Sequence, residues 1–297
     1  MKTDILPSVL ATGRRTLFTG LLATLARRQP AKAAERWQVL PPTPAPPIGA
    51  AGYAKVDGIR LYYLEAGSRT AAGTPVVMLH GGLANSDYFG NQVPALVRQH
   101  RVILVDSRGH GRSTRNGMPF SYDLMTDDVV ALLDQLGIAR VRIVGWSDGA
   151  IIGLDMAMRH PDRVDRVFAF GANTRTSGLK PDVENNPTFA RFIARARQEY
   201  IRLSPTPHDY AGFLAQIGQM WRTQPNWTDD QLRGIQARVL IADGQHDEAI
   251  RRDHTEYMAA TIPRAGLLIL PNVSHFAFLQ DPALFNAAML DFLDGHD

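Results

Sequence analysis

The sequence contains no cysteine among its 297 residues. It can therefore form no disulfide, no cysteine-ligated zinc or iron–sulfur centre, and no thiolate nucleophile. Its histidines and carboxylates do not cluster at the spacing of metal ligands, so we expect neither a metal nor another cofactor. A nucleophile, if the protein has one, is therefore expected among its hydroxyl and other non-thiol side chains.

Long apolar runs are missing from the N-terminal part of the chain. Leu17 to Ala26 provides about ten largely apolar residues, too few for a helix that spans a bilayer. Arg14 and Arg15 precede this run, and the small residues of Ala31 to Ala33 follow it. We predict an export signal peptide over residues 1–33, similar to the twin-arginine type, and a periplasmic or secreted protein with no stable membrane anchor. A mitochondrial or cytoplasmic location is the alternative.

Outside residues 1–33, basic side chains do not outnumber acidic ones. The sequence has 32 basic and 29 acidic side chains, for a formal charge of +3. Residues 1–33 hold six of the basic and one of the acidic side chains, so the remainder is slightly acidic. Such a domain lacks the basic surface that attracts nucleic acid. The expected partner is a small-molecule substrate.

Proline is concentrated between Pro41 and Pro47, which excludes a helix or a central strand there. We predict that residues 34–52 form a proline-rich linker. From Tyr53 onward, short apolar runs alternate with helical patterns, which is typical of a mostly parallel sheet flanked by helices. Residues 53–297 are therefore predicted to form one α/β catalytic domain.

The periodicity predicts eight strands. The first two form a hairpin at Asp57-Gly58, and the later ones are short and rich in β-branched residues, as buried parallel strands are. The predicted strands are Tyr53–Val56, Ile59–Glu65, Val76–Leu79, Arg101–Val105, Val141–Val144, Val164–Phe170, Val239–Ala242 and Leu267–Leu270.

A long insertion separates the sixth and seventh predicted strands. It covers about residues 174–236, far more than the usual handful of residues in such a connection. The pieces Thr188–Leu203, His208–Trp221 and Thr228–Gly234 look helical and are bounded by prolines. We predict a helical lid, inserted before the penultimate strand, over the carboxyl edge of the sheet.

Gly145 to Gly149 has the pattern Gly-x-Ser-x-Gly between a predicted strand and a predicted helix. This setting is that of a nucleophile elbow, in which the glycines relieve crowding around a serine in a strained turn. We predict that Ser147 is the nucleophile. An ordinary glycine-rich turn capped by a serine is the alternative, and the order of the elements disfavours it.

A serine hydroxyl needs a base that accepts its proton and an acid that orients the base. His275 follows the last predicted strand, and Asp247 lies in the loop after the strand before it, in the order expected after such an elbow. Asp243 is the alternative acid, although its place at the strand end is better suited to a turn. His246 and His254 are expected on the solvated surface.

Two backbone N–H groups are predicted to form an oxyanion hole. One comes from the loop after Val76–Leu79, where we prefer Gly82 over Leu83, and the other is the N–H of Asp148. The charge of the Asp148 side chain opposes a developing oxyanion, so a substrate ammonium or an internal arginine is expected beside it. A plain acid at a helix N-terminus is the alternative.

Residues Tyr53 to Phe292 resemble the α/β-hydrolase superfamily. The resemblance is to the valacyclovir hydrolase, or biphenyl hydrolase-like, branch, and it is carried by Gly145-Trp146-Ser147-Asp148-Gly149, Gly171-Ala172-Asn173 and Asp247-Glu248. It implies the α/β-hydrolase fold and the triad Ser147, Asp247 and His275. It also implies that Asp148 binds the amino group of an amino-acid ester.

These residues predict a serine hydrolase that cleaves carboxylic esters through an acyl-serine intermediate. Trp146 and Trp221, with Trp227, are predicted to line an apolar substrate pocket, unless they only pack. The same triad is compatible with lactone, amide or carbon–carbon bond hydrolysis. A non-catalytic ligand receptor on a hydrolase scaffold is the alternative from another functional class.

Overall fold

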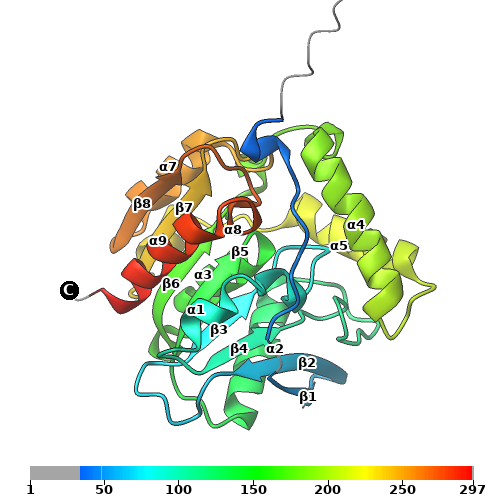
Figure 1. Ribbon diagram of the computed structural model, residues 1–297, viewed down its shortest axis with the longest axis vertical. Helices are drawn as coiled ribbons and strands as arrows, with labels where there is room; N and C mark the ends of the chain where they lie inside the picture. Colours follow the sequence, from blue (N-terminus) through cyan, green and yellow to red (C-terminus); the bar gives the residue numbers. More distant parts are fainter. Residues whose placement is uncertain (1–33, 48, 296–297) are drawn as a thin grey trace, which may run out of the picture. The chain divides into compact units, whose positions relative to one another are not determined.

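The computed structural model describes residues 34–47 and 49–295, so the predicted signal peptide lies outside the described residues. Its centre is one eight-stranded sheet in the order β1-β2-β4-β3-β5-β6-β7-β8 (Figure 1). β1 pairs antiparallel with β2, and β2 pairs antiparallel with β4. The five other strand pairings of this sheet are parallel, which confirms the predicted α/β-hydrolase fold. The strands are β1 (Ala50–Val56), β2 (Ile59–Ala66), β3 (Val76–Leu79), β4 (Val102–Val105), β5 (Val141–Trp146), β6 (Val164–Phe170), β7 (Arg238–Gly244) and β8 (Ala265–Leu270).

Helices cover both faces of the sheet (Figure 1). Every residue of β3 and β4 is buried, as expected for β-branched strands inside a parallel sheet. Ser121 caps the helix that follows β4 by accepting a hydrogen bond from the N–H of Leu124. The helices outside the lid are α1 (Val93–Leu96), α2 (Tyr122–Gln135), α3 (Asp148–Arg159), α7 (Arg252–Thr261), α8 (Ala277–Gln280) and α9 (Pro282–Asp294). Within the described part of the chain, no helix is long and apolar enough to cross a membrane.

The register brings four strand ends to one edge of the sheet. Trp146 at the end of β5 pairs with Phe170 at the end of β6, and Phe170 pairs with Ala242 of β7. Leu270 at the end of β8 pairs with Gly244. The loops that follow these strands carry the predicted nucleophile, acid and base, so parallel pairing places all three at the same carboxyl edge.

The lid consists of α4 (Pro187–Leu203), α5 (Tyr210–Thr223) and α6 (Asp229–Arg233), between β6 and β7 as predicted. Each helix has a side-chain N-cap, provided by Asn186, Asp209 and Thr228. The buried residues of α4 include Phe192, Ala196 and Tyr200, which repeat every four residues and lie on one face. The lid helices therefore bury one face toward the domain and expose the other.

The segment from Arg36 to Pro41, expected to be part of a spacer, packs against the domain (Figure 1, blue). The ring of Trp37 stacks on His246 at 4.5 Å, and the amide of Gln280 donates to the backbone oxygens of Trp37 and Val39. On the other side, Arg195 of α4 donates to the oxygens of Leu40 and Pro41 at 3.0 and 2.7 Å. The segment thus connects the lid to the loops of the carboxyl edge.

Weakening this connection is expected to loosen α4. Arg191 of the same helix donates to the backbone oxygen of Gln38. We expect the double substitution Arg191→Ala/Arg195→Ala to raise KM for a bulky substrate about threefold to tenfold and to change kcat less, because Phe189, Phe192 and Ile193 of α4 line the pocket under the lid. Gln198→Ala, at an exposed position of the same helix, is the matched control. Steady-state kinetics with a short and a bulky p-nitrophenyl ester would measure the effect, and equal KM values in all three proteins would contradict it.

Candidate active site

Ser147 lies in a sharp turn between β5 and α3. Its backbone has φ 55° and ψ −121°, a conformation that side chains rarely adopt, and its N–H donates to the oxygen of Phe170 at 2.9 Å. A Cβ atom on Gly145 would lie 2.5 Å from the Cα of Ala150, and one on Gly149 would lie 2.0 Å from the oxygen of Leu79. Only glycine fits at both flanking positions, which is the steric reason for the Gly-x-Ser-x-Gly pattern.

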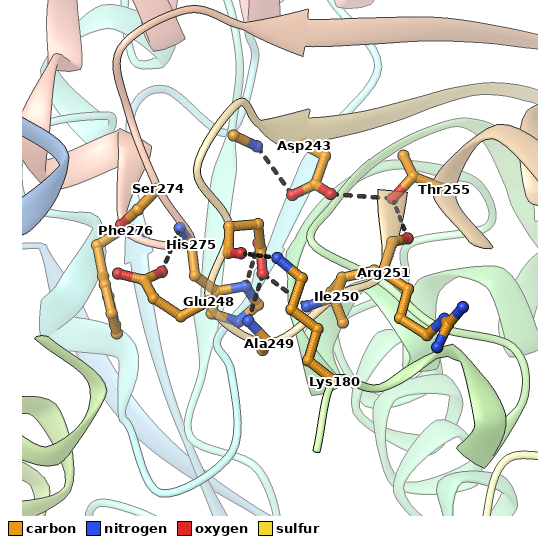
Figure 2. Close-up of polar contacts among 12 residues, drawn as sticks. Lys180, Asp243, Glu248, Ala249, Ile250, Arg251, Thr255, Ser274, His275 and Phe276 are labelled. Carbon is orange, nitrogen blue, oxygen red and sulfur yellow. Dashed lines mark hydrogen bonds and ion pairs between the residues drawn. The ribbon is translucent and has the colours of Figure 1, made fainter. Parts of the chain in front are cut away.

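Asp247 and His275 form a buried pair, and His275 lines the same pocket as Ser147. The Oδ2 atom of Asp247 lies 2.6 Å from Nδ1 of His275, and both side chains are buried. The N–H groups of Ala249 and Ile250 donate to Oδ1 of Asp247 at 2.6 and 2.7 Å, so one carboxylate oxygen is fixed while the other binds the histidine (Figure 2). Lys180 donates to the backbone oxygen of Asp247 at 2.5 Å. Asp247, and not Asp243, therefore contacts His275.

The electrostatics of the pair favour an ionised acid. Burial would raise the pKa of Asp247, but His275 and the hydrogen bonds to its oxygens hold it at about 2. Burial would lower the pKa of His275, yet the charge of Asp247 and the hydrogen bond between them raise it above 6.5. The aspartate is thus charged at neutral pH and stabilises a protonated imidazole, which forms when His275 takes the serine proton.

The raised pKa of His275 predicts the acid limb of the pH–rate profile. Only neutral imidazole accepts the serine proton, so kcat/KM should fall as the pH drops through a pKa above 6.5. The profile should be measured with one p-nitrophenyl ester between about pH 5 and pH 9, where the ester bond is stable enough to follow. An acid limb centred below the ordinary histidine value would contradict the stabilisation by Asp247.

Ser147 and His275 line a pocket of about 450 Å³ beneath the lid. Most of its wall is apolar, and it also includes Gly82 and Asp148, the two residues predicted to provide the oxyanion hole. Asp148 is the first residue of α3, so its N–H has no acceptor within the helix. The apolar and aromatic lining residues are Leu83, Tyr122, Trp146, Leu179, Val183, Phe189, Phe192, Ile193, Leu214, Trp221, Ala249 and Ile250.

The Asp148 carboxylate receives neutral donors rather than a cation. Trp221 of the lid donates to both of its oxygens at 2.8 and 3.1 Å, and the hydroxyl of Tyr122 donates to Oδ1 at 2.9 Å. Burial raises the pKa of Asp148 to about 6, against the effect of these two donors. A Cβ atom on Gly82 would lie 2.3 Å from the ring of Trp221, so the lid packs directly on the predicted oxyanion loop.

Several residues have surroundings in the structure that differ from those predicted from the sequence. His254 is buried rather than solvated: its Nε2 accepts the N–H of Thr174 at 3.0 Å, and burial lowers its pKa to about 4. Trp227 is buried and does not line the pocket, whereas Trp146 and Trp221 belong to its wall. Within the described residues, no group of three or more histidine and carboxylate side chains could hold a metal ion.

Three residues of the site were not singled out from the sequence. Tyr122 reaches Asp148 from α2, Lys180 reaches the acid loop from the start of the lid, and Glu248 accepts the backbone N–H of His275 at 3.0 Å. Burial and the nearby Asp247 raise the pKa of Glu248 to about 7. Glu248 belongs to the pair Asp247-Glu248 that contributes to the family resemblance, but no role was assigned to it from the sequence; Tyr122 and Lys180 lie in no recognisable motif.

Comparison with known proteins supplies independent information. The model of the α/β hydrolase fold family matches residues 74–208. A Caulobacter (strain K31) protein named as a carbamate hydrolase, RutD, is 30% identical over 263 residues, which cover 81% of this chain and 97% of that protein. Mouse serine hydrolase BPHL is 26% identical over 252 residues, which cover 80% of this chain and 84% of that protein. The structure of Est816, described as an N-acyl homoserine lactone degrading enzyme, has a TM-score of 0.64 and 27% identity over 81% of this chain and 100% of that one.

Proposed function

Because the chain belongs to the α/β-hydrolase family, we propose that it is a serine hydrolase that cleaves carboxylic esters through an acyl-Ser147 intermediate. The observation that carries this proposal is the buried Asp247–His275 pair, which faces a mostly apolar pocket that also contains Ser147. This arrangement suits the activation of a serine hydroxyl toward a neutral carbonyl group.

The proposed reaction has two halves. His275 takes the proton of Ser147 through Nε2, because its Nδ1 is bound to Asp247, and the serine oxygen attacks the carbonyl carbon. The N–H groups of Gly82 and Asp148 stabilise the resulting oxyanion, and His275 returns the proton to the departing alcohol. In the second half, His275 deprotonates a water molecule, which attacks the acyl-serine; His275 then gives this proton to the Ser147 oxygen as the acid is released.

The pocket wall supports an apolar, uncharged substrate. Asp148 is a buried carboxyl group on that wall beside the nucleophile, and its oxygens already accept hydrogen bonds from Trp221 and Tyr122. The other two charged lining residues, Lys180 and Glu184, have opposite charges and are exposed. We therefore propose that neutral aliphatic or aromatic esters are better substrates than anionic ones, which the Asp148 charge would repel. The role of Asp148 toward a substrate amine, which the BPHL-like resemblance implies, remains part of the same test.

The testing experiment follows the acyl-enzyme directly. Mixing the enzyme with p-nitrophenyl acetate should release a burst of about one equivalent of p-nitrophenol, followed by slower turnover. A fluorophosphonate should label Ser147 covalently. Peptide mass spectrometry would identify the labelled residue. A panel of neutral, α-amino and carboxylate esters, with a carbamate and an N-acyl homoserine lactone, would then rank the substrate classes. Binding of esters without a burst, labelling or turnover would favour the non-catalytic receptor instead.

A further inference from the structure

Asp243 is a buried carboxyl group that the proposed mechanism does not use. It lies near the end of β7, four residues before the triad acid, and its side chain is only 1% exposed. Its Oδ1 accepts the N–H of Gly244 at 2.8 Å, and its Oδ2 lies 2.9 Å from the hydroxyl of Thr255 on α7 (Figure 2). Both contacts are made by neutral groups.

The neighbour of Asp243 is the carboxylate of Asp247. The two side chains are within hydrogen-bonding reach, and together burial and the charge of Asp247 raise the pKa of Asp243 well above its usual range. Asp247 is the member that stays ionised, because it has His275 and two backbone N–H groups as partners. Two carboxyl groups in such contact do not both ionise at neutral pH.

The cationic groups near this pair are bound elsewhere. Lys180 contacts the backbone oxygen of Asp247, not its side chain. Arg251 pairs with Asp253, and Arg252 lies 3.4 Å from the backbone oxygens of Gly244 and Gln245. Within the described part of the chain, Asp243 makes no ion pair with a cation. The other titratable groups of these loops also have partners: His275 binds Asp247, Glu248 accepts the backbone N–H of His275, and the ring of His246 stacks on Trp37.

We infer that Asp243 carries a proton in the working enzyme and donates a hydrogen bond to Asp247, which makes it a positioning residue for the triad. The inference rests on the proposed serine mechanism. The charged carboxylate of Asp247 is a stronger acceptor than the hydroxyl of Thr255, so the proton is directed to Asp247. Thr255 then donates to Asp243.

This hydrogen bond has two consequences for catalysis. It adds a third neutral donor to the two backbone N–H groups on Asp247, so the carboxylate keeps the orientation that His275 requires. It also lowers the proton affinity of Asp247, so that the proton taken from Ser147 stays on the imidazole instead of passing to the acid. The pair of carboxyls thus separates into one proton donor and one charged acceptor.

The proton on Asp243 can be observed without any substrate. At about pH 8, the infrared difference spectrum of wild type minus Asp243→Asn should contain the carbonyl stretch of a buried carboxylic acid. This pH lies above the pKa values of Asp148 and Glu248, about 6 and 7, and both groups are shared by the two proteins. A spectrum with only carboxylate bands at this position would overturn the inference, whatever the activity of the enzyme.

Kinetics provide the second readout. Asp243→Ala removes the donor and should lower kcat for a p-nitrophenyl ester about tenfold or more, with KM little changed. Asp243→Asn supplies an N–H donor in place of the carboxylic acid and should keep most of the wild-type rate. Its pH–rate profile should have the same acid limb as the wild type, because a neutral amide replaces a neutral carboxylic acid. An acid limb shifted to lower pH in Asp243→Asn would mean that a negative charge had been removed, and would overturn the inference.

Two controls keep the outcomes separate. Thr255→Val removes the hydroxyl on the other side of Asp243 and should leave kcat within about threefold of wild type, since Asp247 keeps all its donors. If Asp243→Ala does not fold, Asp243→Asn and the infrared spectrum still decide. Absence of ester turnover in the wild type would refute the proposed function while the infrared band still reported the proton on Asp243. Equal rates in the alanine and asparagine variants would refute the positioning role.

Discussion

Replacing Ser147 by alanine is expected to lower kcat for ester hydrolysis by about 10⁶-fold, the loss seen when a serine–histidine unit is broken. The mechanism passes through a bond to the serine oxygen, and alanine has no atom to form it. The residual rate should reflect binding and the oxyanion donors alone. The strained turn should persist, because its glycines and the N–H of Ser147 are unchanged.

The measurement is steady-state hydrolysis of a p-nitrophenyl ester, with the burst phase recorded in the same experiment. Ser274→Ala is a matched control: this serine precedes His275 and is buried, but it does not line the pocket. Its loss should cost far less than tenfold in kcat beyond any effect on folding. If Ser147→Ala retained more than about one per cent of the rate, the acyl-serine mechanism would be refuted.

Replacing Asp247 by asparagine is expected to lower kcat by about 10⁴-fold without unfolding the protein. The N–H groups of Ala249 and Ile250 fix one oxygen of the side chain, so the asparagine NH₂ would take the place of the oxygen that faces His275. An N–H group there opposes the N–H of Nδ1 and forces the ring proton to Nε2. The imidazole would then present no lone pair to Ser147.

The same substitution at Asp253 is the control, because its carboxylate is exposed on α7 and pairs with Arg251 at the surface. Asp253→Asn should keep kcat within about twofold, as surface ion pairs contribute little. Thermal unfolding would show that Asp247→Asn is folded. A loss of less than tenfold would indicate that another carboxyl, with Asp243 or Glu248 the nearest, supports His275 instead.

Much of the fold follows from local sequence patterns. The predicted strands Val76–Leu79 and Val164–Phe170 match β3 and β6 residue for residue, and the other six differ by three residues or fewer at an end. Short β-branched runs have few alternatives to a buried strand, so their identity depends little on distant contacts. The lid was also evident from the sequence. Its two long helices, α4 and α5, are amphipathic, and prolines bound the helical pieces of the insertion.

The packing of polar groups was less accessible from the sequence. His254 was expected in solvent but is buried under the loop at Thr174, and the segment around Trp37 contacts lid and core although its composition suggested a spacer. Composition reports average tendencies, whereas burial of one side chain depends on what packs over it. The N-terminal leader predicted for residues 1–33 lies outside the described residues and stays a prediction.

The sequence by itself determined the family, the positions of the strands along the chain and the strand–turn–helix setting of Ser147. These features depend on residues close together in the chain. Only the tertiary structure decided which acid meets His275, that Trp221 and Tyr122 bind Asp148, and that Asp243 lies against Asp247. The contacts of His275 and of Asp148 join residues that lie 26 to 73 positions apart in the chain. Their geometry, and therefore the protonation of each carboxyl, exists only after the strands have paired and the lid has packed on the sheet.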